Sequence, residues 1–167
     1  ERWMPLPPKK VSALVGSPVT ETITKAKTIP VLPEDFEALL DNLEADGKLE
    51  LRLAVGLVGL YGLRPSELAV MRLDDDGKLY VGGQVKRDAK AIEQGAEKPE
   101  RLVKPLDLNG REGLGREMAM LWYNGRGPRK LPLAIRNEIA KVGEKNTFKE
   151  VGAAFSQLLT RYRYWKI

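Results

Sequence analysis

The feature that most constrains this chain is an apolar run that stops at a glycine and is followed at once by Arg-Pro. Between Leu53 and Leu63 nearly every side chain is apolar, so a helix there must be buried over most of its circumference. Gly62 suits the left-handed position that closes a helix, and Pro65 suits the first turn of the next one. The sequence therefore predicts a buried helix, a sharp stop and a short helix from Pro65 to about Met71.

Arg64, between these two helices, needs a reason for its position. A cation at the start of a helix opposes the helix dipole, and a residue before proline avoids helical geometry. A phosphate would supply the reason, because a helix N-terminus and a guanidinium can both donate hydrogen bonds to it. A structural ion pair with Glu67, or with the acids at 74–76, explains the same residue. The residues alone leave both interpretations open.

The octamer Tyr61-Gly62-Leu63-Arg64-Pro65-Ser66-Glu67-Leu68 resembles the first arginine box of the tyrosine recombinases, the phage-integrase family. In that family a small sheet after the first arginine presents a lysine. Lys86, in the sequence Gly83-Gln84-Val85-Lys86, falls at the corresponding place, and Lys90 is its main rival. The resemblance covers roughly residues 30 to 165.

The resemblance implies site-specific DNA recombination or integration, with strand cleavage and rejoining through a phosphotyrosine and without metal or cofactor. Arg64 would stabilise charge on the scissile phosphate, Lys86 would protonate the departing sugar oxygen, and Glu67 would support Arg64. The family's His-x-x-Arg box and tyrosine nucleophile have no counterpart before Ile167, because Tyr162 and Tyr164 precede the place of that box and are interpreted as helix-face residues. We therefore expect a truncated catalytic domain that is inactive alone, from a phage or mobile-element protein that self-associates on DNA.

The charge distribution agrees with a nucleic-acid partner. The net charge is +5, yet residues 33–76 hold eleven acidic and four basic side chains, so the rest of the chain carries +12. Separation of basic from acidic segments favours a surface that faces a polyanion, here double-stranded DNA. The residues expected to contact DNA are basic side chains of the hairpin and of the loop that follows the next helix: Arg87, Lys90, Arg101, Arg126, Arg129 and Lys130.

Missing residue types exclude several functions. The chain contains neither cysteine nor histidine, which excludes disulfides, thiolate zinc sites and a self-contained Ser-His-Asp hydrolase. The acid triplet at 74–76 lacks the pattern of a calcium loop and is interpreted as a turn. The apolar run is too short to span a bilayer, so we expect a soluble, cytoplasmic, DNA-associated protein.

The remaining sequence predicts an α+β fold, mostly helical with a small antiparallel β-hairpin. Residues 1–30 are rich in proline and are expected to form an extended arm or linker from a preceding domain, and residues 31–167 the partial catalytic domain. Helices are predicted over 33–47, 113–123 and 133–142, and from the capping box Thr147-x-x-Glu150 to the C-terminal region. Residues 78–85 and 101–108 are predicted to pair as strands, bringing Arg64 and Lys86 to one concave, positive surface.

Two other classes of function fit the same residues. One is a non-enzymatic, basic helical module that grips DNA or RNA through phosphates, and the other is an interaction domain that meets an acidic protein. Steeply salt-dependent binding of duplex DNA would distinguish the recombinase and the nucleic-acid-binding module from the protein-interaction domain. A tyrosine nucleophile in the parent reading frame separates the recombinase from the simple binding module.

Overall fold

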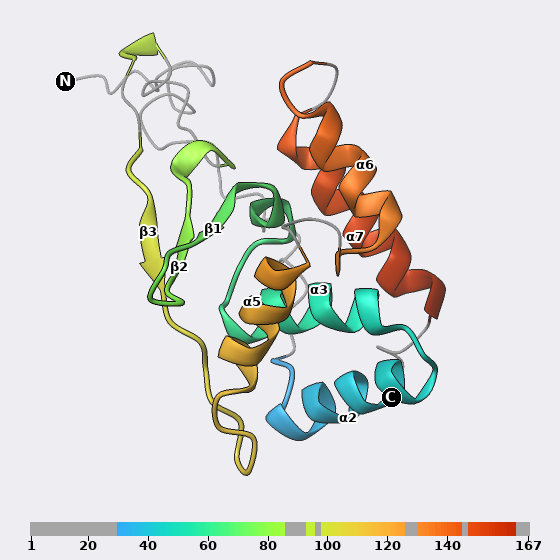
Figure 1. Ribbon diagram of the computed structural model, residues 1–167. Helices are drawn as coiled ribbons and strands as arrows, with labels where there is room; N and C mark the ends of the chain where they lie inside the picture. Colours follow the sequence, from blue (N-terminus) through green and yellow to red (C-terminus); the bar gives the residue numbers. More distant parts are fainter. Residues whose placement is uncertain (1–29, 86–92, 96–97, 126–129, 145–146, 163–167) are drawn as a thin grey trace, which may run out of the picture. The chain divides into compact units, whose positions relative to one another are not determined.

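The structure is a computed structural model that describes residues 30–85, 93–95, 98–125, 130–144 and 147–162. The chain divides by its own contacts into two units, Glu1–Val31 and Leu32–Ile167, and the second is described below. Nearly all of the predicted arm at 1–30 lies outside the described residues. The predicted fold class is confirmed, since the described residues are mostly helical with a small antiparallel sheet (Figure 1).

Apart from β1 and η2, which were not predicted, the elements follow the predicted order along the chain. They are α2 (Pro33–Ala45), α3 (Leu49–Leu60), the 3-10 helix η1 (Pro65–Val70), β1 (Met71–Leu73), β2 (Leu79–Val81), the 3-10 turn η2 (Gly83–Val85), β3 (Arg101–Val103), α5 (Leu114–Asn124), α6 (Leu133–Lys141) and α7 (Phe148–Tyr162). No helix in the described part of the chain is long and apolar enough to cross a membrane.

Helix α3 is the centre of the core, as its sequence predicts. Seven of its twelve residues are buried, and the helix contacts α2, α5, α7 and η1. Its glycines allow two of these approaches. A Cβ on Gly56 would collide with the side chain of Met118 on α5, and one on Gly59 would collide with the ring of Phe36 on α2. The apolar run is thus surrounded by other elements on most sides.

The sheet has three strands in the order β1-β2-β3, all antiparallel. The predicted pairing of the second and third strands is confirmed, but β1 was not foreseen, because Met71 was expected to end the short helix. Both predicted strands are also too long. The first ends at Val81 since Gly82 and Gly83 follow it, and the second ends at Val103, two residues before Pro105 would remove a ladder N–H.

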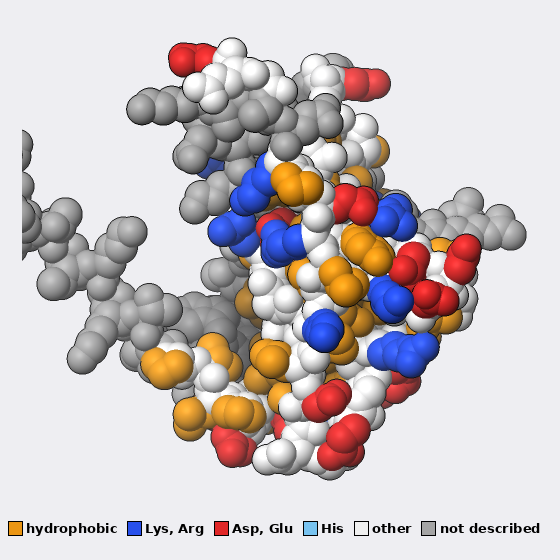
Figure 2. Space-filling model, turned by 90° about the vertical axis from the view of Figure 1, so that its left-hand side faces the viewer, with side chains coloured by type: hydrophobic (Ala, Val, Ile, Leu, Met, Phe, Trp, Pro, Cys, Tyr) orange, Lys and Arg blue, Asp and Glu red, His pale blue; other side chains and the backbone are white. Residues whose placement is uncertain are grey.

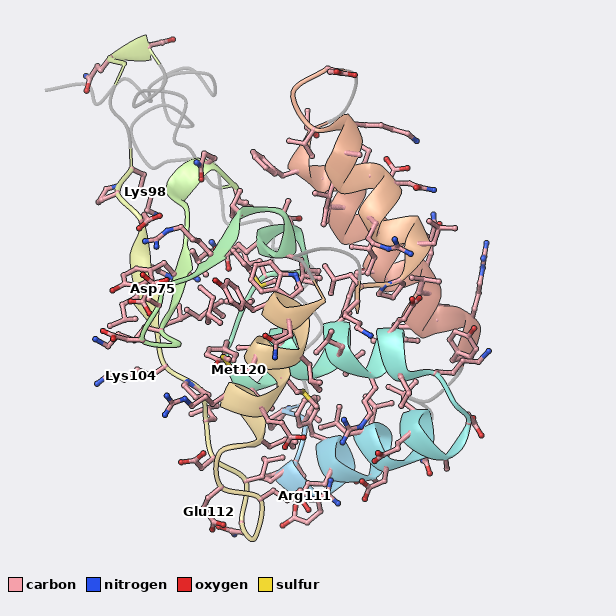
Figure 3. The ribbon with its side chains drawn as sticks, viewed as in Figure 1. Asp75, Lys98, Lys104, Arg111, Glu112 and Met120 are labelled. Atoms are coloured by element: carbon pink, nitrogen blue, oxygen red, sulfur yellow. The ribbon has the colours of Figure 1, made fainter. Side chains whose placement is uncertain are left out.

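The start of the β2–β3 connection is in close contact with η1 and with the residue Lys98, which precedes β3. The N–H of Gly82 donates to the carbonyl of Val70 at 2.9 Å, which attaches the end of β2 to η1. On the other side, a Cβ on Gly83 would overlap the backbone of Lys98, so only glycine permits this approach. We call Gly82, Gly83 and Lys98 the neck of the connection; Figure 3 labels Lys98 beside the start of β3.

Helix α7 begins at the predicted capping box and packs against both α6 and η1 (Figure 1). The Glu150 carboxylate accepts the Thr147 N–H at 3.0 Å and its hydroxyl at 2.7 Å. Gly152 lies against η1 so closely that a Cβ there would stand 2.7 Å from the hydroxyl oxygen of Ser66. The longest helix of the described chain therefore supports the segment that directly follows Arg64.

Candidate phosphate-binding site

The position of Arg64 is fixed by the way α3 ends. Gly62 has φ +61°, as predicted, and the Leu63 N–H donates back to the carbonyl of Val58 at 2.9 Å, which is the bond of a Schellman stop. Leu63 is buried, whereas Arg64 has an extended backbone with φ −75° and ψ 141°. The buried Leu63 and the following η1 thus hold the Arg64 backbone from both sides.

Glu67 is the third residue of η1, three positions after Arg64. It is the one buried charged residue among those described, with 2% of its side chain exposed. Residues three apart eclipse each other in a 3-10 helix. This geometry lets the Arg64 N–H donate to Glu67 Oε2 at 2.8 Å and the Arg64 guanidinium to Oε1 at 3.4 Å. The structural alternative for Arg64 is therefore partly realised, with Glu67 as the partner.

Arg101 supplies the stronger contact with this carboxylate. Its two terminal nitrogens donate to Oε1 at 2.8 Å and to Oε2 at 2.9 Å, a bidentate pair between β3 and η1. In the sheet register Arg101 lies opposite Val81, a fully buried residue, so strand alternation points Arg101 toward the core side. Leu102 points the other way and is 46% exposed.

Sequence reasoning placed Arg101 among the DNA contacts and did not foresee its partner. Leu102 and Leu106 are both exposed, whereas Val103 packs on the core. The fact that would have revealed the direction of Arg101 is its pairing with the buried Val81. This pairing cannot be assigned before the register of the two strands is known.

Arg64, Arg101 and Glu67 form an arginine cluster whose charges do not cancel. Burial alone would raise the pKa of Glu67, but the hydrogen bonds and charges of Arg101 and Arg64 outweigh it and lower that pKa. The hydrogen bond to Glu67 raises the pKa of Arg101, so both partners are held in their charged forms. Two guanidinium groups thus surround one ionised carboxylate, with a net charge of +1.

The spare charge is best assigned to Arg64. Its side chain is 52% exposed, and within the described residues its guanidinium makes only the long 3.4 Å bond to Glu67. Most of its donors therefore face solvent, where an oxyanion can reach them. The helix dipole adds little, since η1 is a six-residue 3-10 helix rather than the regular helix that the dipole argument assumes.

The acid triplet does not bind Arg64 and forms the predicted turn. One Asp74 oxygen accepts the backbone N–H groups of Asp76 and Lys78 at 3.0 and 2.7 Å, while the Asp76 carboxylate pairs with Lys78 at 3.3 Å. No group of three or more acidic side chains in the described ranges is arranged to hold a metal ion.

Most of the other predicted site residues belong to segments outside the described part of the chain. Lys86, Arg87, Lys90, Arg126 and Arg129 lie outside the described residues, so the predicted convergence of Arg64 and Lys86 is a prediction still. Lys130 is exposed just before α6. The turn η2, which ends directly before Lys86, contacts η1.

The molecular surface on the sheet side carries both signs of charge. Figure 2 shows lysine and arginine side chains there interspersed with acidic ones. Arg72 of β1 and Glu100, just before β3, form an exposed pair, joined by two hydrogen bonds at 3.2 and 2.7 Å. The Arg72 guanidinium lies 4.6 Å from the ring centre of Tyr80. Arg72 thus pairs with an exposed carboxylate by two hydrogen bonds, as Arg101 does with the buried carboxylate of Glu67.

Comparison of the chain with family models, with curated proteins and with solved structures found no match. The tyrosine-recombinase resemblance accordingly rests on the arginine-box octamer and on the order of the elements around it.

Proposed function

We propose that this chain is the first-box portion of a tyrosine recombinase catalytic domain and that Arg64 binds a phosphate of duplex DNA. The observation that carries the proposal is the state of Arg64, whose backbone is held at both sides while its guanidinium is half exposed beside a buried carboxylate that Arg101 already occupies. A structural arginine at such a site is expected to take the bidentate place itself.

Chemically, this arrangement fits phosphoryl transfer. A guanidinium keeps its proton at any physiological pH and can donate two parallel hydrogen bonds to non-bridging oxygens, where charge develops in the transition state. Lys86 is proposed as the general acid that protonates the leaving sugar oxygen. The nucleophile is a tyrosine outside these 167 residues, and so is the second box, since the chain contains no histidine.

The proposed activity of the chain by itself is duplex DNA binding without cleavage. Binding is measured by fluorescence anisotropy with a labelled duplex over a range of salt concentrations. Loss of one phosphate contact should lower the slope of log affinity against log salt by about 0.9, so Arg64→Ala should show this change and weaken binding about tenfold. Arg116→Ala is the matched control, because Arg116 is an exposed arginine on α5.

Cleavage is tested with a nicked suicide substrate that traps covalent protein–DNA adducts. The chain alone should form none, whereas a longer protein that contains it should form an adduct at a tyrosine beyond residue 167 and lose that adduct in Arg64→Ala. An adduct at Tyr162 or Tyr164 would show that the nucleophile was misassigned. Binding that ignores salt, or equal binding by Arg64→Ala and Arg116→Ala, would refute the phosphate assignment and favour a protein partner.

A further inference from the structure

The buried carboxylate of Glu67 has two arginines within reach, and they are not bound equally. Arg101 makes two bonds, at 2.8 and 2.9 Å, whereas the Arg64 guanidinium makes one at 3.4 Å. Both arginines belong to exposed or half-exposed parts of the surface, with 52% of the Arg64 side chain and 44% of the Arg101 side chain accessible. Solvent access therefore does not explain why Arg101 has the closer contact.

The order of contacts follows from the backbone. Arg64 is already joined to Oε2 through its own N–H at 2.8 Å, so its side chain must fold back over that bond to reach the same carboxylate. Arg101 approaches from the neighbouring strand with both nitrogens in line with the two oxygens. A planar guanidinium that meets a carboxylate in this way forms the strongest type of ion pair.

We propose that Arg101 is a positioning residue that occupies the Glu67 carboxylate and thereby keeps the Arg64 guanidinium available for a DNA phosphate. This proposal rests on the proposed function of Arg64. Without Arg101, a buried carboxylate would be left with the Arg64 N–H and a single long side-chain contact, an arrangement that is costly for a charged group. The nearest remaining cation among the described residues is Arg64, which would turn inward and pair with Glu67.

The proposal predicts a rescue that a merely structural role for Arg101 does not. Arg101→Met should weaken duplex binding, by about fivefold for partial loss of one charged contact. Adding Glu67→Gln should restore binding, because the carboxylate that captures Arg64 is then gone. In an Arg64→Ala background, Arg101→Met should change affinity by less than about 1.5-fold, since there is no guanidinium left to capture.

The exposed pair of Arg72 and Glu100 provides a matched control for charge. Arg72→Met removes one positive charge from the same sheet and breaks a bidentate pair of similar geometry. Arg72→Met, alone or combined with Glu100→Gln, should show only the small change expected from net charge. All variants are measured where circular dichroism shows them folded.

A second readout does not depend on DNA. The Nε–H signal of Arg64 in the NMR spectrum of the free protein should become more ordered in Arg101→Met and return to the original state when Glu67→Gln is added. Unchanged Arg64 dynamics would overturn the proposal. So would an Arg101→Met effect on affinity that persists in Arg64→Ala, because it would mean that Arg101 contacts DNA directly. If Arg64→Ala binds DNA as well as the original chain, the proposed function fails, while the Arg64 signal still decides whether Arg101 positions Arg64.

Discussion

Replacement of Glu67 by glutamine tests the central cluster through stability alone. The side chain keeps its shape, but one of the two oxygens becomes an NH₂ group, which donates and cannot accept. Glu67 accepts four hydrogen bonds, two at each oxygen. In Glu67→Gln one pair of donors therefore loses its acceptor, and the other pair loses the negative charge that strengthens it.

The magnitude follows from these contacts. A hydrogen bond to a charged group contributes about 1.5–3 kcal/mol, and leaving a buried group unsatisfied costs about as much. The two arginines can partly turn to water because about half of each is exposed, which reduces the loss, but the Arg64 N–H cannot move. We expect Glu67→Gln to lower the free energy of unfolding by about 2–4 kcal/mol at pH 7.

The effect should also depend on pH with a defined sign. The pKa of Glu67 is lowered in the folded state, so its stabilisation is present above the pKa of the unfolded chain and is lost as pH falls through the lower folded pKa. Below that pH the wild-type carboxyl is neutral too. The difference between the wild-type protein and Glu67→Gln should therefore shrink steadily as the solution is made acidic.

The measurement is urea unfolding followed by circular dichroism at several pH values from neutral to acidic. Glu100→Gln is the matched control, because Glu100 also holds an arginine by two bonds but is exposed, and exposed pairs contribute little. A loss for Glu67→Gln no larger than that for Glu100→Gln, or one that does not change with pH, would refute the account of Glu67 as a buried, ionised acceptor.

Three further changes test how the scaffold holds this cluster, each by urea unfolding. Gly62→Ala should cost about 1 kcal/mol, because its φ of +61° is strained for alanine although no atom lies within 4 Å of the new Cβ; no loss would contradict the left-handed stop. Gly115→Ala should cost about 1–3 kcal/mol, since its Cβ would lie 2.5 Å from that of Pro105, and a neutral result would disprove the close approach of α5. Thr147→Ala should cost about 1 kcal/mol through loss of the α7 cap, with Lys149→Ala as a control expected to change little.

Local patterns in the sequence were sufficient to predict most of the helices. Gly62, the capping box at Thr147 and the apolar run of α3 each act within one or two turns, where spacing determines the structure. The limits of the strands were predicted less well. β2 ends at Val81, before Gly82 and Gly83, and the close approach of Gly83 to Lys98 links two segments that are separated along the chain. Such contacts have no local signature.

The candidate site was also predicted only where its contacts are local in the sequence. The pairing of Arg64 with Glu67 was among the sequence-based alternatives, since the two residues are three apart. Arg101 was assigned to DNA because its partner is 34 positions away and becomes visible only when the register of β2 and β3 is known. Charge alone could not distinguish an arginine that binds a buried acid from one that faces solvent.

The neck formed by Gly82, Gly83 and Lys98 also affects which insertions and deletions such a chain can accept during evolution. Because Gly83 and Lys98, at the two ends of the β2–β3 connection, lie against each other, added residues between them need not displace Arg101 or η1. Lengthening a closed loop costs only about 0.6 kcal/mol for each doubling of its length. Insertions and deletions within this connection should therefore be tolerated without disturbing the arginine cluster, whereas replacement of Gly83 by a residue with a side chain should not.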